Sequence, residues 1–205
     1  MKRILAIGAH PDDIEIGCGG TLAKHVADGD EVTMLVITDG ANGPGHIEQR
    51  MDEQQSSCEV LGVKQLVWGR IPDCEVSLHE KALVGVIERV IRETRADIIY
   101  THSINDSHQD HVAVARGTLG AARHCPTILA YDAPSSIGFQ ETVFVDISTT
   151  IDKKVEALQC HASQVAASPM VSADRERAKA TVAGHHARVL MAEGFQPVRM
   201  LMCQL

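Results

Sequence analysis

The residues best suited to chemistry stand in one short stretch, His10-Pro11-Asp12-Asp13, which follows the apolar run Ile4 to Ala9. His10 and Asp13 are three residues apart, so an imidazole nitrogen and a carboxylate oxygen can converge on one cation. Asp12 lies between them and projects differently, which leaves it free to act as a base. A lone histidine at a strand end is more often structural, but the two carboxylates favour half of a metal site.

A second group, His108-Gln109-Asp110-His111, stands about a hundred residues later. His111 can supply the third ligand, because two imidazoles and one carboxylate leave a tetrahedral position for water on Zn²⁺. The same ligand set also suits Fe²⁺ or another divalent metal. We expect His108 to be protonated and to face an oxyanion or a leaving amine, with Asp110 holding its ring in one tautomer. The simpler alternatives are a solvent-exposed His108 and a helix cap at Asp110.

The elements that must position these groups alternate between apolar strands and amphipathic helices. This alternation predicts one domain, residues 1–205, with an α/β fold: a Rossmann-like, doubly wound, mostly parallel sheet with helices on both faces. A glycine-rich stretch, Gly17 to Gly20, is expected to form a loop after the first strand. Strands are predicted at residues 4–9, 31–38, 65–69, 97–102, 127–131, 143–147 and 198–203. Helices are predicted at residues 21–27, 50–61, 78–94, 110–124, 152–164 and 173–193.

The two chemical groups follow the first and the fourth predicted strand. In a doubly wound sheet of order 3-2-1-4-5 these strands are neighbours, and the loops at their carboxyl ends open into one crevice. We therefore expect the groups around His10 and His111 to meet there. The loop after the second strand, which contains Asp39, is expected to lie over the same crevice.

Composition excludes several classes of function. The chain has 205 residues, with 19 Lys and Arg against 27 Asp and Glu and a formal charge of −8, so nucleic acid is an unfavourable partner. Aromatic residues make up only 3%, which argues against a stacking surface for bases. The six cysteines show no C-x-x-C spacing, and no segment resembles a signal peptide or a membrane span. These features predict a soluble, cytoplasmic protein with no membrane partner.

The paired motifs A-H-P-D-D and H-Q-D-H resemble those of the PIG-L/LmbE family of zinc-dependent N-acetylglucosaminyl-type deacetylases. The resemblance extends over nearly the whole chain. Family-like segments also stand at Thr38-Asp39-Gly40, Arg50-x-x-Glu53, Leu61-Gly62, Lys154, His161-x-Ser163-Gln164 and Ala192-Glu193-Gly194-Phe195.

This resemblance implies hydrolysis of the N-acetyl group of an N-acetylglucosamine-type amino sugar or its conjugate, at a Zn²⁺ ion. Asp12 matches the general base of the family, and His108 with Asp110 matches the oxyanion and relay pair. The metal ligands are matched by His10, Asp13 and His111. The chain departs from members that act on inositol- or thiol-linked glucosamine in the loop Ile104-Asn105-Asp106.

Two further residues are candidates for substrate binding. Arg50 matches an arginine that contacts substrate in the family, although a surface ion pair with Glu53 is an equal alternative. Asp39 is expected either to contact the substrate or to cap its own loop. His161 is more simply a packed or partner-facing histidine, and Lys154 a solvated side chain.

Other functions remain open from the sequence. A zinc amidohydrolase that acts on a non-sugar N-acyl or N-formyl amine would need the same residues. A dinucleotide-binding protein fits less well, because Leu22 stands where the third glycine of that fingerprint is required. A metal-binding partner protein without catalysis would not need both Asp12 and His108. A small soluble amino sugar is the expected partner, and homo-oligomerisation is possible.

Overall fold

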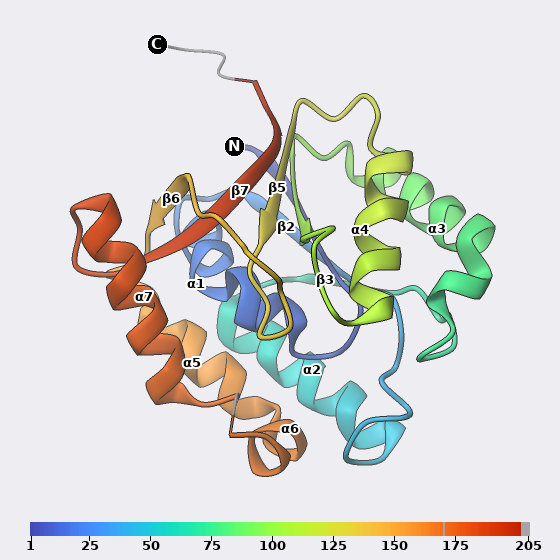
Figure 1. Cartoon of the computed structure of the whole chain (residues 1–205), viewed down its shortest axis with the longest axis horizontal. Helices are drawn as coiled ribbons and strands as arrows, with labels where there is room; N and C mark the ends of the chain where they lie inside the picture. The colour runs from blue at the N-terminus through green and yellow to red at the C-terminus, as the bar shows by residue number, and fades with distance from the viewer. Residues whose placement is uncertain (170, 202–205) are drawn as a thin grey trace.

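The structure is a computed structural model that describes residues 1–169 and 171–201. Its centre is a seven-stranded sheet of order β3-β2-β1-β4-β5-β7-β6 (Figure 1). The strands are β1 (Arg3–Gly8), β2 (Glu31–Val36), β3 (Gln65–Trp68), β4 (Ile98–His102), β5 (Thr127–Tyr131), β6 (Val143–Asp146) and β7 (Ala192–Met200).

The first five strands are parallel and follow the predicted order, with β1 between β2 and β4. This order confirms the doubly wound α/β fold. β7 runs antiparallel to both β5 and β6, which it separates. It begins six residues before the predicted final strand, because residues 192–197 pair with β5 and β6 rather than continuing a helix. Positions 202 and 203 of that prediction lie outside the described residues.

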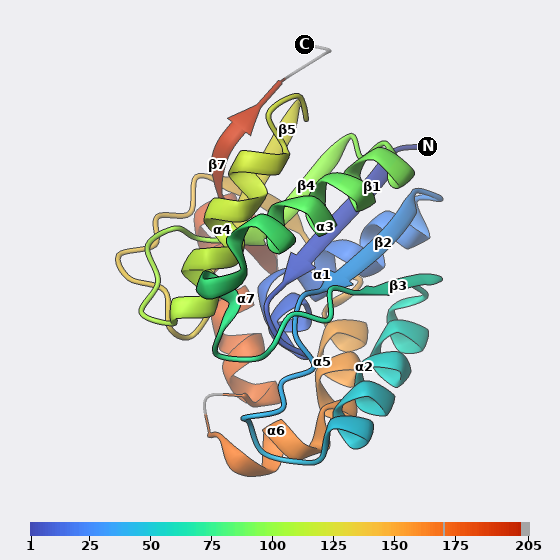
Figure 2. The ribbon, with the colours of Figure 1, turned by 90° about the vertical axis from the view of Figure 1, so that its right-hand side faces the viewer.

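Helices cover both faces of the sheet (Figure 2). On one face α3 and α4 pack on β1 and β4, and on the other face α1 and α5 pack together with α2 beside α5. Two separate apolar clusters, dominated by Ile, Leu, Val and Ala, fill these faces. The helices are α1 (Asp13–Ala27), α2 (Ile47–Leu61), a short 3-10 helix η1 (Val76–His79), α3 (Glu80–Thr94), α4 (Gln109–Ala121), α5 (Ile151–Cys160), α6 (Ala162–Ala167) and α7 (Ala173–Ala187).

The glycine-rich stretch lies inside α1, so the predicted loop is wrong. α1 begins at Asp13 and is kinked at Cys18, whose φ of −148° is not helical. The kink frees the amides of Gly20 and Thr21, which donate to the carboxylate of Glu193 at 3.0 and 2.7 Å. A carboxylate at a helix amino end is favourable, so a side chain from β7 stabilises the second half of α1. Gly17 is required for packing, since a Cβ there would meet the ring of Tyr131.

Lys154 is buried at the same place, contrary to the expected solvated position. Its Nζ contacts Glu193 at 2.7 Å and Glu176 at 3.0 Å, and it donates to the carbonyl of Ile16. Burial alone would lower the pKa of Lys154, but the two carboxylates outweigh it and raise that pKa. The charge therefore stays on the lysine, and the ion cluster joins α5, α7 and β7 to α1.

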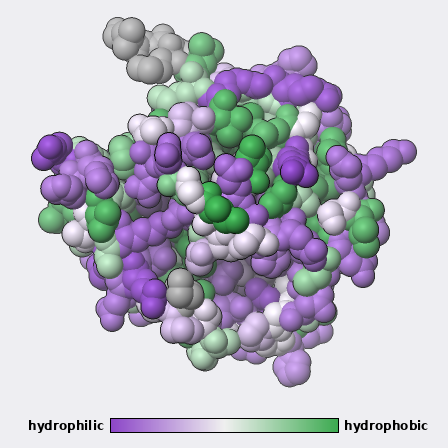
Figure 3. Space-filling view, in the orientation of Figure 1, coloured by the Kyte–Doolittle hydropathy of each residue, from purple (hydrophilic) through white to green (hydrophobic). Residues whose placement is uncertain are grey.

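Among the described residues, no helix combines the length and the apolar character needed to cross a bilayer. On the face shown in Figure 3, charged and apolar residues are mixed, and apolar residues gather near the end of β7, which carries the exposed Val198 and Met200.

Candidate metal and catalytic site

The two predicted groups meet at the carboxyl ends of β1 and β4. The carboxylate of Asp13 lies between two imidazoles: Oδ2 is 3.3 Å from His10 Nδ1, and Oδ1 is 3.3 Å from His111 Nε2. His10 comes from the turn after β1 and His111 from the first turn of α4, so the strand order alone brings them together. The prediction that His10, Asp13 and His111 lie close together is therefore confirmed.

His102 also reaches Asp13, although its sequence context indicated a ligand role only weakly. It ends β4, it is 1% exposed, and its Nε2 lies 3.2 Å from Asp13 Oδ2 and 3.1 Å from the amide of Ala9. Burial and then the charge of His111 lower the pKa of His102 to about 4, so its ring is neutral at physiological pH. Burial would raise the pKa of Asp13, but the surrounding imidazoles outweigh it and lower that pKa well below its usual value.

Two more carboxylates lie on the other side of His10. Its Nε2 is 3.1 Å from Asp73 Oδ1 and 3.4 Å from Asp110 Oδ2. Burial would lower the pKa of His10, yet Asp110, Asp13 and Asp73 together raise it well above its usual value. The predicted contact between Asp110 and the ring of His108 is made by the backbone N–H of Asp110, while the Asp110 carboxylate accepts from Cys74 N at 2.8 Å.

His111 is oriented from behind by a residue that the sequence motifs did not assign. Its Nδ1 lies 3.2 Å from Asp106 Oδ2 and 3.1 Å from Ser135 Oγ. A carboxylate on the far nitrogen of an imidazole fixes the tautomer and turns the other nitrogen toward a metal. Nε2 of His111 is therefore the nitrogen that faces Asp13.

His108 lies against two imidazoles of the cluster, those of His10 and His111. Its ring stacks on His111 with centroids 4.5 Å apart, and its Nδ1 accepts from the backbone N–H of Asp110 at 3.3 Å. Burial, and then the charges of His10 and His111, lower its pKa, which works against the protonated ring that the sequence predicts. Because Nδ1 accepts a hydrogen bond, the neutral ring carries its proton on Nε2.

The donor set fits a divalent cation. Asp73 Oδ1 and Asp110 Oδ1 are buried and accept no well-aligned hydrogen bond within the described part of the chain. Imidazole nitrogens and carboxylate oxygens are the ligands that Zn²⁺ and Fe²⁺ take in proteins. Ligand atoms within 4.8 Å of one another form three overlapping groups: His10, His108 and His111; Asp13, His102 and His111; and His10, Asp73 and Asp110.

Asp12 stands beside this cluster with an unusual backbone. Its φ of 98° and ψ of −25° lie in the left-handed region, which costs a residue with a Cβ about 1 to 2 kcal/mol. It precedes α1 but makes no side-chain capping hydrogen bond to the described residues, so its carboxylate is not committed to the helix. Burial and then the charge of Asp13 raise its pKa, against the opposing charges of His161 and Arg50. A buried carboxylate with a raised pKa is suited to accept a proton.

Arg50 is buried, with 4% of its surface exposed. Its guanidinium donates to the carbonyls of Gly40 and Pro11 and thus ties the loop after β2 to the loop after β1. The alternative of an ion pair with Glu53 is wrong, because the Glu53 carboxylate instead accepts from Ser163 N and Oγ. Contact between Arg50 and a substrate stays a prediction.

Asp39 borders a cavity of about 460 Å³ beside the cluster. Its Oδ1 accepts from Ala41 N at 3.1 Å, so the expected loop cap is present. The cavity reaches Asp73, and Asp73 in turn contacts His10. The only tryptophan of the chain, Trp68, also lines it. Contact between Asp39 and a substrate is thus sterically open and stays a prediction.

Sequence reasoning missed Asp73 and Asp106 and indicated His102 only weakly as a ligand. Asp73 follows Pro72 soon after a strand, and His102 ends a strand next to β1, so both stand at a carboxyl edge of the sheet. Asp106 precedes the H-Q-D-H motif in the loop that leads to α4. Position relative to the strand ends would have found them.

The part of the chain that carries both motifs matches a known family. Residues 5–122 match the family model PIG-L, described as GlcNAc-PI de-N-acetylase, and this range includes both motifs. The chain is 35% identical over 169 residues to the uncharacterized deacetylase YaiS of Escherichia coli K12, covering 79% of this chain and 91% of that protein.

Two further proteins are similar. A diacetylchitobiose deacetylase of Thermococcus kodakarensis is 31% identical over 189 residues, covering 80% of this chain and 70% of that protein. The crystal structure of the conserved protein TT1542 from Thermus thermophilus superposes with a TM-score of 0.88 at 26% identity, covering 100% of this chain and 98% of that one. On these matches, and with the two motifs drawn together at one edge of the sheet, the chain belongs to the PIG-L family of N-deacetylases.

Proposed function

We propose that this protein removes the N-acetyl group from an N-acetylglucosamine-type amino sugar or its conjugate, with Zn²⁺ as its cofactor. The observation that carries the proposal is Asp12, a buried carboxylate next to Asp13, which itself contacts His10 and His111. The similarity to a diacetylchitobiose deacetylase and to a family model described as GlcNAc-PI de-N-acetylase supports the sugar substrate.

In this proposal His10, Asp13 and His111 hold the metal, as predicted from their spacing. When bound, Zn²⁺ polarises the amide carbonyl and lowers the pKa of a coordinated water. His102 and Asp106 lie behind this set, where His102 contacts Asp13 and Asp106 contacts His111. They keep the ligand atoms turned toward a common point.

Asp12 acts as the general base in this proposal. Its carboxylate accepts a proton from the attacking water and can return it to the departing amine. Because its pKa is raised, the carboxylate of Asp12 has a higher proton affinity than that of an ordinary aspartate and is a stronger base.

His108 stabilises the oxyanion as a neutral donor in this proposal. Since its Nδ1 accepts from the Asp110 amide, its Nε2–H is available toward the cluster. A neutral imidazole that donates a hydrogen bond to a developing oxyanion needs no positive charge. Asp110 contributes through its backbone N–H to His108 and through its carboxylate to His10.

The cavity beside Asp73 supports binding of a sugar ring. It combines apolar side chains, Ile47, Met51 and Trp68, with the polar Asp39 and Asp73. Pyranose rings present an apolar face and a rim of hydroxyl groups, which fits an aromatic surface with carboxylates near it.

The test is a panel of N-acyl compounds with the zinc-loaded protein. N-Acetylglucosamine, N,N′-diacetylchitobiose and N-acetylglucosaminides are compared with N-acetyl and N-formyl amino acids, and free amine and acetate or formate are measured. We expect turnover of the N-acetyl sugars, loss of turnover after removal of the metal, and recovery on adding Zn²⁺. Preference for the amino-acid derivatives would instead support the amidohydrolase alternative. Higher activity with Fe²⁺ than with Zn²⁺ would replace Zn²⁺ by Fe²⁺ as the proposed cofactor.

A further inference from the structure

Two residues of α2 contact the peptide group that precedes the proposed base. Arg50 and Gln54 are four residues apart, so their side chains leave the same face of the helix. Arg50 Nη2 donates to the carbonyl of Pro11 at 3.1 Å. Gln54 Oε1 accepts from the N–H of Asp12 at 3.4 Å. The carbonyl of Pro11 and the N–H of Asp12 belong to one peptide group, so α2 holds a single peptide plane at its two opposite edges.

Rotation of this plane changes ψ of Pro11 and φ of Asp12 together, because the peptide itself is rigid. Asp12 has the left-handed φ of 98° described above, without a side-chain cap within the described chain. A strained backbone persists only where the surroundings hold it. The contacts from Arg50 and Gln54 are placed to hold this one.

Glu15 decides which way the amide of Gln54 faces. Gln54 Nε2 donates to Glu15 Oε1 at 2.6 Å, and Ser57 Oγ donates to the same oxygen at 2.6 Å. An ionised carboxylate can only accept, so the amide nitrogen turns to Glu15 and the amide oxygen is left for Asp12 N–H.

His161 completes the arrangement from the junction of α5 and α6. Its Nε2 lies 3.5 Å from Glu15 Oε1, and both side chains are fully buried. An imidazolium at this distance balances the buried charge of Glu15. His161, which the sequence predicts to be packed or partner-facing, therefore supports the residue that orients Gln54.

We propose that Arg50, Gln54 and Glu15 are positioning residues, a peptide clamp that fixes the Pro11–Asp12 peptide and thereby aims the Asp12 carboxylate. The clamp acts on Asp12 through the backbone. It gives Arg50 a role other than the predicted substrate contact. The inference rests on the proposed role of Asp12 as the general base.

The first test replaces Gln54 by methionine, which keeps the length of the side chain and removes both polar atoms. We expect Gln54→Met to keep its zinc content and its KM, while kcat falls by about 10- to 100-fold, because small displacements of a reacting group have effects of that size. The matched control is Gln55→Met, at the next residue, which is exposed and donates to the Glu59 carboxylate. An unchanged kcat in Gln54→Met, or a fall in kcat matched by an equal loss of zinc, would overturn the clamp.

A second test exchanges the polarity of the pair. In the double variant Glu15→Gln with Gln54→Glu, the carboxylate at position 54 can accept from Asp12 N–H and from the amide at position 15. We expect its kcat to exceed that of the single variant Gln54→Glu by at least about tenfold, which corresponds to one restored hydrogen bond to a charged group. No recovery in a folded, zinc-loaded double variant would contradict the hydrogen-bond arrangement.

A third measurement separates this inference from the proposed function. Hydrogen exchange of the Asp12 amide is measured in the absence of substrate, so it reports on the clamp whatever Asp12 does in catalysis. We expect faster exchange in Gln54→Met and unchanged exchange in Gln55→Met. Unchanged exchange in both would refute the clamp, whereas full activity of Asp12→Asn would refute the proposed base.

Discussion

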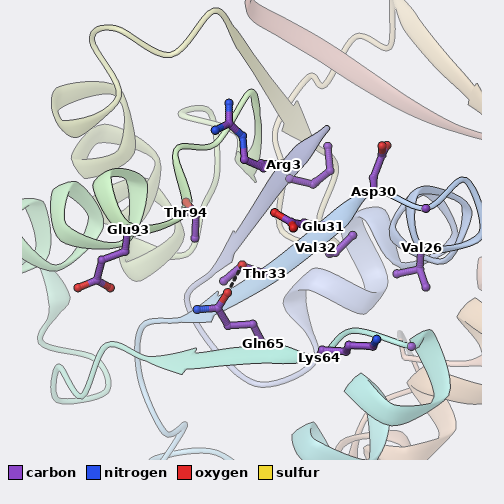
Figure 4. A pocket seen from close by; sticks show the side chains of 13 residues that line it. Arg3, Val26, Asp30, Glu31, Val32, Thr33, Lys64, Gln65, Glu93 and Thr94 are labelled. Atoms are coloured by element: carbon purple, nitrogen blue, oxygen red, sulfur yellow. Dashed lines mark hydrogen bonds between the residues drawn. The ribbon is translucent and has the colours of Figure 1, made fainter. Parts of the chain in front are cut away.

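The two ends of the sheet carry cavities of similar size and different chemistry. At the amino ends of β1, β2 and β3, a cavity of about 520 Å³ is lined by charged side chains, among them Arg3, Glu31 and Lys64 (Figure 4). At the carboxyl ends, the cavity of about 460 Å³ reaches Asp73 and, through it, His10. Volume alone would not distinguish the two.

The burial of the charges distinguishes the two ends. Arg3 pairs with Asp97 at 2.7 Å, with both side chains 38% exposed, so water screens this pair. Asp73 and Asp110 are 7% and 0% exposed, and each has an oxygen that accepts no well-aligned hydrogen bond from the described residues. Both carboxylates face the imidazole of His10, and buried charges of this kind are costly unless a positive charge lies beside them.

The largest expected effect is loss of the metal. Replacing His111 or Asp13 by alanine removes a proposed ligand, so both zinc content and turnover should be lost. The matched variant Asp97→Ala at the other end of the sheet should keep both. Metal analysis of the purified proteins checks this prediction, and full zinc content in His111→Ala would remove that residue from the ligand set.

The next effect separates the base from the ligands. Asp12→Asn should bind zinc normally, while its kcat falls by about 10² to 10⁴, the usual contribution of a general base. The asparagine is close in size, so the cluster keeps its shape. Steady-state kinetics with metal analysis decide the question, because an equal loss of zinc would place Asp12 among the ligands instead.

Acid should destabilise the metal-free protein through Asp73. Burial would raise the pKa of Asp73, but the contacts with His10 and with Asn42 N outweigh it and lower that pKa to about 2. Between pH 4 and pH 2 the unfolded chain therefore takes up this proton first, so stability falls as the pH falls. The contribution lost over that window is about 1 to 2 kcal/mol.

Urea unfolding between pH 2 and pH 6 measures this loss. In Asp73→Asn the free energy of unfolding should depend less steeply on pH. At the other end of the sheet, Arg3 lowers the pKa of Asp97 by an exposed contact. Salt should therefore reduce the contribution of Asp97 and leave that of Asp73 nearly unchanged. Equal sensitivity to salt would mean that the two ends do not differ as described.

A smaller effect is expected at the wall of the substrate cavity. Trp68→Ala should raise KM for an N-acetyl sugar by about two- to tenfold, the size of one aromatic contact, and leave kcat and zinc content unchanged. Trp68→Phe should restore most of the affinity. Since Trp68 is the only tryptophan, its fluorescence should also change when the sugar binds to the wild-type protein. No change in KM or in fluorescence would place the sugar elsewhere.

The smallest effect is expected at the amino end. Arg3→Met breaks an exposed ion pair and should leave kcat, KM and zinc content as they are. Thermal unfolding should shift only slightly. Any loss of turnover in this variant would show that the cavity in Figure 4 takes part in the reaction.

Local sequence patterns predicted most of the elements because hydrophobic periodicity depends on neighbouring residues. The order of the first five strands and the meeting of His10, Asp13 and His111 followed from that pattern together with the rules of parallel sheets. The glycines at 17, 19 and 20 favour a loop by their local pattern, but the structure has them in α1. The helix is stabilised there by the carboxylate of Glu193, which is 172 residues away from Thr21 and gives no signal in the local pattern. The position of β7 between β5 and β6 likewise depends on pairing between strands that are far apart in the sequence.

By itself, then, the sequence determined which side chains could bind a metal and at which strand ends they stand. Only the tertiary structure decided which charges are buried, and burial sets their protonation. It placed Arg50 and Lys154 inside, gave His108 a lowered pKa, and set Asp73 and Asp106 behind the imidazoles. The physical reason is that spacing along the chain is local, whereas the loss of water around a charge depends on every element packed against it.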